Sequence, residues 1–267
     1  MENNICGFIE LNGELLKISS VEDLKNLAAR LGSTFTELSV RDFEKLCEKL
    51  NGEYKKDDCG VFYSNDGRRL LFAPITSDEY IIKTGTIAIS RYAFNWHFYE
   101  SDGALYTYKN EYQKKITKLF IPSSVIAIGS DAFCDNTAIE EIIVSSNLEY
   151  IGNNAFRGCW KMCDFTIPTS LKYIESEAFD RCCNAFTELV LPKSMKHIGS
   201  HAFRGCTRLE KVTFLSEIED IGSGIFEGCE KLAKIVVPKG TSKKFCEQLP
   251  FFADIITENE DDLNSIN

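Results

Sequence analysis

The stretch LFIPSSVIAIGSDAFCDN at residues 119–136 contains the pattern that decides the fold of this chain. Its Ala-Phe motif returns along the sequence, with the last copy changed to Ile-Phe, and successive phenylalanines are 23, 23, 24 and 23 residues apart: Phe133, Phe156, Phe179, Phe203 and Phe226. A fixed period of this size indicates a repeat protein, in which each short unit stacks on its neighbours. We therefore expect a solenoid.

Other columns keep the phase of the phenylalanines. Eleven residues before each Phe the column contains Pro122, Ser145, Pro168, Pro192 and Leu215. Five residues before each Phe stands an isoleucine that glycine usually follows, with Glu175 as the exception. Three residues after each Phe the column contains Asn136, Cys159, Cys182, Cys206 and Cys229. Each unit therefore reads LxxLxLP and then xxLxxIGxxAFxxC.

In the LxL part of each unit, apolar positions alternate with a position that is not restricted to apolar residues, which is typical of a short strand. The proline that often follows cannot donate a ladder hydrogen bond, so it ends the strand. We expect the Ile-Gly pair to turn the chain and Ala-Phe to begin a short helical or 3₁₀ turn whose Phe enters the core. The Asn or Cys side chain can meet turn backbone groups inside the stack.

The phrases LFIPSSVIAIGSDAF (119–133) and IGNNAFRGC (151–159) resemble the BspA-like leucine-rich repeat, a family found on bacterial surfaces and in some protists. The resemblance covers roughly residues 75 to 245. It implies an α/β fold: a right-handed leucine-rich-repeat solenoid of stacked short parallel strands. The family is associated with binding and adhesion, and it supplies no catalytic residues to carry over.

The ends of the array predict caps, because an open solenoid must cover its terminal strands. Residues 1–74 should form a hairpin around Asn12-Gly13, two helices that begin at Ser20 and Ser39, and a second hairpin over 61–73. This segment is interpreted as a cap or as a small separate domain. Residues 75–257 should form the solenoid, with an insertion at 95–115, a short helix over 241–249 and a last strand over 251–257; residues 258–267 are expected to be a disordered acidic tail.

Charge and composition exclude several classes. The net charge of −10 argues against a nucleic-acid partner and against an anionic membrane surface. The first twenty residues lack the basic start and apolar stretch of a signal peptide, and no segment has the roughly 18 consecutive apolar residues that span a bilayer. The eleven cysteines are odd in number and four of them occupy equivalent repeat positions, which favours free thiols in the cytoplasm. Export to the cell surface by a non-classical route is the alternative.

No cofactor or metal site is expected. His197 and His201 near Cys206 could suggest zinc ligands, but each histidine falls in an exposed repeat column. The cysteine spacings also differ from those of zinc knuckles and redox motifs. The sequence lacks the motifs of serine hydrolases, phosphate-binding loops and zinc proteases, so we do not expect an enzyme.

Two surfaces are candidate binding sites. The first is a column formed by Tyr150, Tyr173, His197 and Asp220, beside Glu149, Lys172, Lys196 and Glu219. Strands in register would place these residues about 4.8 Å apart, either as a binding ridge or as ladder packing that only stabilises the stack. The second is the aromatic insertion, which includes Trp96 and Tyr99 and could be a contact loop or an irregular unit that buries its rings.

These observations favour a monomeric, non-catalytic module that binds an unknown protein partner through its solenoid surface. The alternative is cell-surface adhesion or carbohydrate binding, with the aromatic insertion stacked on sugar rings. Neither hypothesis identifies the partner.

Overall fold

The computed structural model describes residues 54–73, 77–91, 93–94, 116–144, 146–163 and 165–259, and the backbone of four further strands at 7–11, 14–18, 97–99 and 105–107. The chain divides into two compact units. The first contains Met1–Glu53 and His97–Tyr108, and the second contains Tyr54–Trp96 and Lys109–Asn267.

Two antiparallel hairpins lie in the first unit. Strands β1 (Gly7–Leu11) and β2 (Glu14–Ile18) pair with Leu11 opposite Glu14, which confirms the hairpin expected around Asn12-Gly13. Strands β8 (His97–Tyr99) and β9 (Leu105–Thr107) pair inside the insertion. The helices expected after Ser20 and Ser39 lie outside the described residues.

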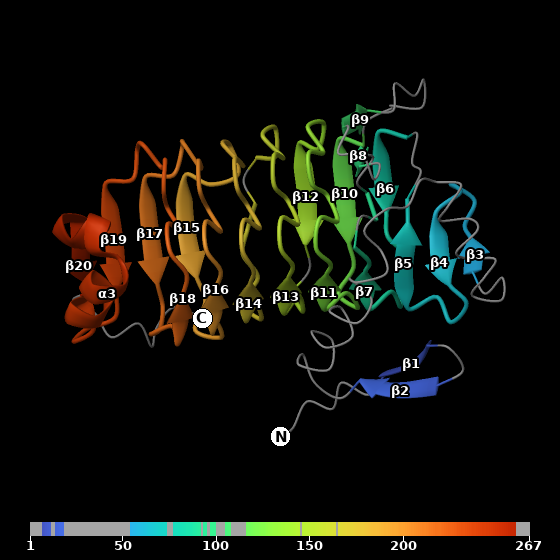
Figure 1. Cartoon of the computed structure of the whole chain (residues 1–267), viewed down its shortest axis with the longest axis horizontal. Helices are drawn as coiled ribbons and strands as arrows, with labels where there is room; N and C mark the ends of the chain where they lie inside the picture. Colours follow the sequence, from blue (N-terminus) through green and yellow to red (C-terminus); the bar gives the residue numbers. More distant parts are fainter. Residues whose placement is uncertain are drawn as a thin grey trace. The chain divides into compact units, whose positions relative to one another are not determined.

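The second unit is a solenoid built from two rows of parallel strands (Figure 1). The long-strand row contains β6 (Glu79–Ile81), β10 (Lys118–Ile121), β12 (Glu141–Val144), β15 (Glu188–Leu191), β17 (Lys211–Phe214) and β19 (Lys234–Val237). The short-strand row contains β7 (Ala88–Ile89), β11 (Ala127–Ile128), β13 (Tyr150–Ile151), β14 (Tyr173–Ile174), β16 (His197–Ile198) and β18 (Asp220–Ile221). The solenoid and its parallel strands, as expected from the repeat, are confirmed, and few helices accompany them.

The short-strand row corrects one detail of the sequence interpretation. The isoleucine of the Ile-Gly pair does not simply turn the chain, because it closes a second, two-residue strand that pairs with the turns before and after it. The glycine that follows lies where adjacent turns approach most closely. A Cβ atom on Gly199 would lie 2.3 Å from Ser176 N, and one on Gly152 would lie 2.6 Å from Ser130 N. Glycine therefore sets the spacing between turns.

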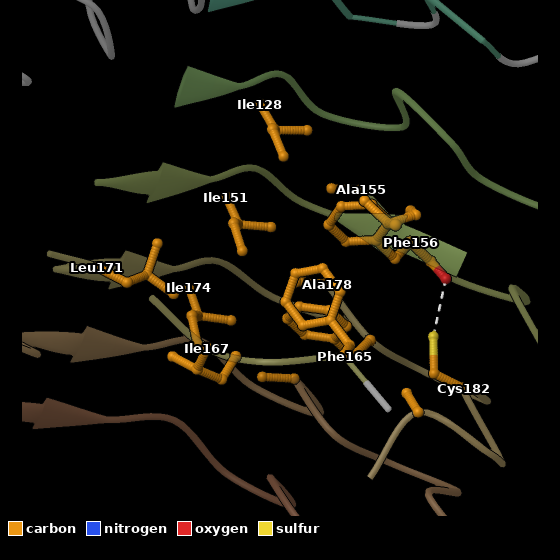
Figure 2. Packing of buried hydrophobic residues seen from close by; sticks show 14 of the residues in the cluster. Ile128, Ile151, Ala155, Phe156, Phe165, Ile167, Leu171, Ile174, Ala178 and Cys182 are labelled. Carbon is orange, nitrogen blue, oxygen red and sulfur yellow. Dashed lines mark hydrogen bonds between the residues drawn. The ribbon is translucent and has the colours of Figure 1, made fainter. Parts of the chain in front are cut away.

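The repeated phenylalanines form the core of the solenoid. They are buried and lie one above the next, with ring centroids of successive residues 4.6 to 5.9 Å apart from Phe94 to Phe226. Figure 2 shows Phe156 beside the stacked isoleucines Ile128, Ile151 and Ile174. Offset aromatic pairs contribute about 0.5–1.5 kcal/mol each beyond the area that they bury, so the stack is a main source of stability.

The cysteine column binds backbone carbonyl groups inside the stack. The Cys182 thiol donates to Phe156 O of the preceding turn at 2.9 Å (Figure 2), and Cys159 donates to Phe133 O at 3.2 Å. Cys206 and Cys229 make the same contact one and two turns further on. This geometry confirms that the column meets turn backbone groups. Burial also raises the pKa of Cys182, so its thiol keeps the proton that the hydrogen bond needs.

The Ala-Phe segments form turns and not the helical or 3₁₀ turns that the sequence suggested. The residue two positions before each Phe adopts a left-handed backbone conformation at Asp131, Asn154, Glu177 and His201, with φ near 55°, and Gly224 continues the column. His201 therefore occupies a repeated turn position. It contacts Glu227, with Nε2 3.2 Å from Oε2.

Three antiparallel strands lie at the N-terminal end of the solenoid. Strands β3 (Tyr54–Lys56), β4 (Phe62–Ser64) and β5 (Arg69–Phe72) extend the short-strand sheet, and β5 pairs with β7. The buried hydroxyl groups of Tyr63 and Tyr80 lie 2.6 Å apart, and Tyr80 OH donates to Asp57 Oδ2. This chain of hydrogen bonds ties the hairpin to the first long strand.

The C-terminal end is closed by helix α3 (Ser242–Gln248), a 3₁₀ helix at Pro250–Ile255 and strand β20 (Ile256–Glu258), which pairs with β19. The short helix before Pro250 is confirmed. The last strand is shorter than expected, because most of the FFADIIT segment is helical. Glu258, assigned to the tail by sequence, is the final residue of β20.

Replacing Gly199 by alanine tests the close approach of adjacent turns. The new methyl group meets the backbone of Ser176, which cannot move without distorting its own turn, so we expect Gly199→Ala to lower the free energy of unfolding by about 2 kcal/mol. The exposed Glu219→Ala variant is the matched control and should stay within about 0.5 kcal/mol of the parent. Urea denaturation measures both, and equal midpoints would contradict the steric explanation.

Alkylation with iodoacetamide tests the cysteine column. Cys163 and Cys59 are exposed, whereas Cys159, Cys182 and Cys206 are buried and hydrogen-bonded to carbonyl groups. We expect the exposed pair to react quickly in the native protein and the buried three to react only after unfolding. Peptide mass spectrometry identifies the labelled residues. If Cys182 in the native protein is labelled as fast as Cys163, the reagent reaches the cysteine column and the column is not buried.

Candidate functional site

The expected column of Tyr150, Tyr173, His197 and Asp220 is present as one row on the short-strand sheet. The ladder pairs Tyr150 with Tyr173, Tyr173 with His197 and His197 with Asp220. Each of these residues precedes an isoleucine of the strand, and because successive side chains point to opposite faces, the row lies on the outer face. We refer to these four residues as the ridge.

The tyrosines form the aromatic part of the ridge. Tyr150 and Tyr173 are half-buried, and their ring centroids are 6.5 Å apart at an interplanar angle of 47°. In the neighbouring column, Lys172 Nζ lies 2.8 Å from Glu149 Oε2. Lys196 and Glu219 of the same column are exposed. The tyrosine rings therefore stand beside a charged strip.

Glu175 joins the two halves of the ridge and was not among the candidate residues. Its carboxylate accepts a hydrogen bond from the Tyr150 side chain, and its Oε2 lies 3.8 Å from His197 Nε2. His197 Nδ1 is 2.9 Å from Asp220 Oδ2 on the other side. The sequence did contain the signal, because Glu175 is the residue that replaces glycine after the isoleucine.

The arrangement suits binding better than chemistry. Burial, together with the charge and hydrogen bond of Glu175, raises the pKa of Tyr150 well above its ordinary value, so the phenol stays neutral. His197 lies between two carboxylates and has no hydroxyl or thiol nucleophile among its described contacts. Within the described ranges, no group of three or more His, Cys, Asp or Glu side chains is arranged to hold a metal ion.

The second candidate surface is only partly described. Trp96 lies outside the described residues, and Tyr99 is the last residue of β8, opposite Leu105 of β9. The hairpin shows that the insertion has strands of its own. Its role in binding stays a prediction.

Changing Glu175 to glutamine tests its contact with Tyr150. The substitution removes the negative charge but keeps a hydrogen-bond acceptor, so we expect the pKa of Tyr150 to fall while staying above the ordinary value, because burial remains the largest cause of its shift. A pH titration of ¹³C-labelled tyrosine by NMR follows the change, with Tyr150→Phe to assign the signal. An unchanged pKa would show that the carboxylate does not face this phenol.

A search of the described helices finds none that is long and apolar enough to cross a membrane. Comparison with curated proteins gives no match. Solved structures do show similarity. A leucine-rich repeat protein from Eubacterium ventriosum is 21% identical with a TM-score of 0.50, and 67% of this chain and 50% of that chain are covered.

Two further structures are similar to part of the chain. The T. pallidum leucine-rich repeat protein is 26% identical over 52% of this chain and 67% of that chain, with a TM-score of 0.44. A leucine-rich cell surface protein from Faecalibacterium prausnitzii is 18% identical over 70% of this chain and 53% of that chain, with a TM-score of 0.48. The chain thus spans about half the length of the Eubacterium and Faecalibacterium proteins.

The family comparison covers more than half of the chain. The model of the BspA-type leucine-rich repeat region matches residues 105–232 and 181–250, with six copies. The matched residues include the strands from β10 to β19. The chain therefore belongs to the BspA-type leucine-rich repeat family.

Proposed function

We propose that this protein is a non-catalytic module that binds a protein partner, and that the ridge is its contact surface. The observation that carries the proposal is the register of the short strands, which places Tyr150, Tyr173, His197 and Asp220 in one uninterrupted row. Tyrosine supplies contact area at a low entropic cost, and such residues are enriched where proteins bind one another.

The network around Glu175 supports this role because it holds the ridge in one conformation before a partner arrives. Tyr150 and His197 both contact this carboxylate, and His197 also contacts Asp220. Side chains that are already ordered lose less entropy on binding. Ladder packing explains the same contacts without a partner, so the two interpretations must be separated by experiment.

We further infer that the protein works in a reducing compartment. The nine described cysteines are all free thiols. Four of them are buried donors to backbone carbonyl groups, a role that a disulfide sulfur cannot fill. Fractionation of the native host tests the inference: we expect the protein in the cytoplasmic fraction, and recovery at the cell surface would overturn it and favour the adhesion alternative.

Affinity purification from the native host, followed by mass spectrometry, tests the binding role. We expect a specific protein partner, and we expect the double variant Tyr150→Ala/Tyr173→Ala to lose it because each ring supplies an anchor, with a loss of at least about 2 kcal/mol of binding free energy. Recovery of no specific protein would contradict the proposed function. Glycan-array binding that depends on the same rings would favour carbohydrate recognition.

Matched variants separate binding from stability. Tyr150→Phe/Tyr173→Phe keeps both rings and should keep the partner, whereas Glu188→Ala/Thr213→Ala changes outward residues of the other face, on β15 and β17, and should have no effect. Circular dichroism and thermal melting confirm that each variant is folded. If the folded alanine variant still binds the partner, the ridge only stabilises the stack by packing between neighbouring strands. Another surface of the module would then bind the partner.

A further inference from the structure

The long-strand row is interrupted in the middle of the solenoid, between β12 and β15. Strand β12 ends a three-stranded sheet and β15 begins a four-stranded one, and the described residues 165–168 between them form no strand (Figure 1). Phe165 N instead donates to Ala185 O at 2.9 Å, 20 residues further on, whereas the ladders on either side join residues 23 apart, such as Leu189 and Val212. The sheet is therefore broken at this turn.

The break coincides with two departures from the repeat in the sequence. One Phe spacing is 24 residues instead of 23, and the additional residue falls between Cys182 and Leu189. Phe165 and Phe186 replace smaller apolar residues of the repeat in the same region, and their rings lie 6.1 Å apart, edge to face. The longer loop and the larger rings therefore lie beside the turn where the ladder is interrupted.

A hollow of about 430 Å³ lies against the long-strand sheet at this break. It is lined by Glu140, Glu141, Ile142, Ile143, Val144, Cys163 and Thr166. Its wall carries aliphatic surface, since the Ile143 side chain is 41% exposed. Its rim carries the exposed carboxylates of Glu140 and Glu141.

The edge of β12 adds backbone polar groups to the hollow. Glu141 N donates to Thr117 O on the side of β10. Because successive residues of a strand direct their backbone groups to opposite sides, those of Ile142 point toward the break, and no described residue of the 165–168 segment hydrogen-bonds with them. A ligand in the hollow therefore meets the backbone N–H and C=O groups of Ile142 beside an aliphatic wall.

Each rim carboxylate is paired with a lysine that a cationic ligand would replace. Lys161 Nζ is 3.6 Å from Glu140 Oε1, and Lys118 Nζ is 2.7 Å from Glu141 Oε2, so each carboxylate has a neighbouring lysine. Exposed pairs of this kind contribute little free energy and can be exchanged or shared. The whole chain also carries a net charge of −10, which attracts a basic partner.

We propose that the hollow is a docking site for an arginine side chain carried by an extended, basic segment of a partner protein. The methylene groups of arginine fit against Ile143, and its planar guanidinium offers several donors to the two carboxylates and the β12 edge. This site lies on the long-strand face and is separate from the ridge. It gives the module a second contact whose specificity is electrostatic.

Fluorescence anisotropy with a defined probe tests the proposal on the full chain. The probe is a short fluorescein-labelled peptide of alternating arginine and threonine, and a peptide of alternating glutamate and threonine is its control. We expect saturable binding of the arginine peptide only. Absence of binding up to about 1 mM peptide, or equal binding of the glutamate peptide, overturns the proposal.

Two matched substitutions locate the binding. Ile143→Arg places a like charge in the hollow and should raise the Kd about tenfold or more, the effect of losing one charge-assisted contact. Val190→Arg adds the same charge at the equivalent exposed position of β15, outside the hollow, and should change the Kd by less than about twofold. Both side chains are exposed, so both variants should fold. Equal loss of binding in the two variants would mean general attraction to this face and would overturn the site.

The carboxylates and Cys163 give independent readouts. Glu140→Gln/Glu141→Gln should weaken the binding of the arginine peptide, whereas Glu79→Gln on β6 should leave the binding unchanged. Bound peptide should also slow iodoacetamide labelling of Cys163, which lines the hollow, but not of Cys59. Unprotected Cys163 at saturating peptide would place the peptide elsewhere. The Tyr150→Ala/Tyr173→Ala variant should bind the peptide normally, so failure of the ridge and failure of the hollow are distinguishable.

Discussion

The close approach of one turn to the next is the constraint on which the rest of this structure depends. Successive turns are joined by backbone hydrogen bonds without interruption in the short-strand row, and the glycine after most of the short strands lets the backbones meet without a Cβ between them. Once that spacing is set, the phenylalanine rings must stack and the cysteine thiols must reach the carbonyl of the turn before. Core and backbone thus share one repeat distance.

The same constraint arranges the surface into rows. Any residue that precedes a strand isoleucine lies directly beside its counterparts in neighbouring turns, whatever its type. The chain can therefore change outward residues freely while the core stays periodic. The ridge is one product of this arrangement, since tyrosine, histidine and aspartate occupy equivalent places on a common backbone. Its side chains interact because the ladder brings them together.

Much of the fold was predictable from sequence because periodicity reports stacking directly. The columns of Phe, Ile and Cys required equivalent environments, and register followed from the period, which placed Tyr150 beside Tyr173. The second strand row was missed because each strand has only two residues, too few for an alternating pattern to appear. The 3₁₀ helix at Pro250–Ile255 was mistaken for a strand because its apolar run fits either structure.

The sequence shows where the repeat is broken, but it does not show what these exceptions do in the structure. Glu175 was noted only as a missing glycine, yet its carboxylate joins Tyr150 to His197, a contact that depends on side-chain reach and not on period. The spacing of 24 is likewise one number in a series, but the long-strand ladder is interrupted beside the additional residue, and a hollow lies against Ile143 at this interruption. A strict repeat would present the same surface in every turn. Departures from the repeat are therefore the places where one turn of this solenoid differs from the next, and we expect the specificity of its binding to depend on them.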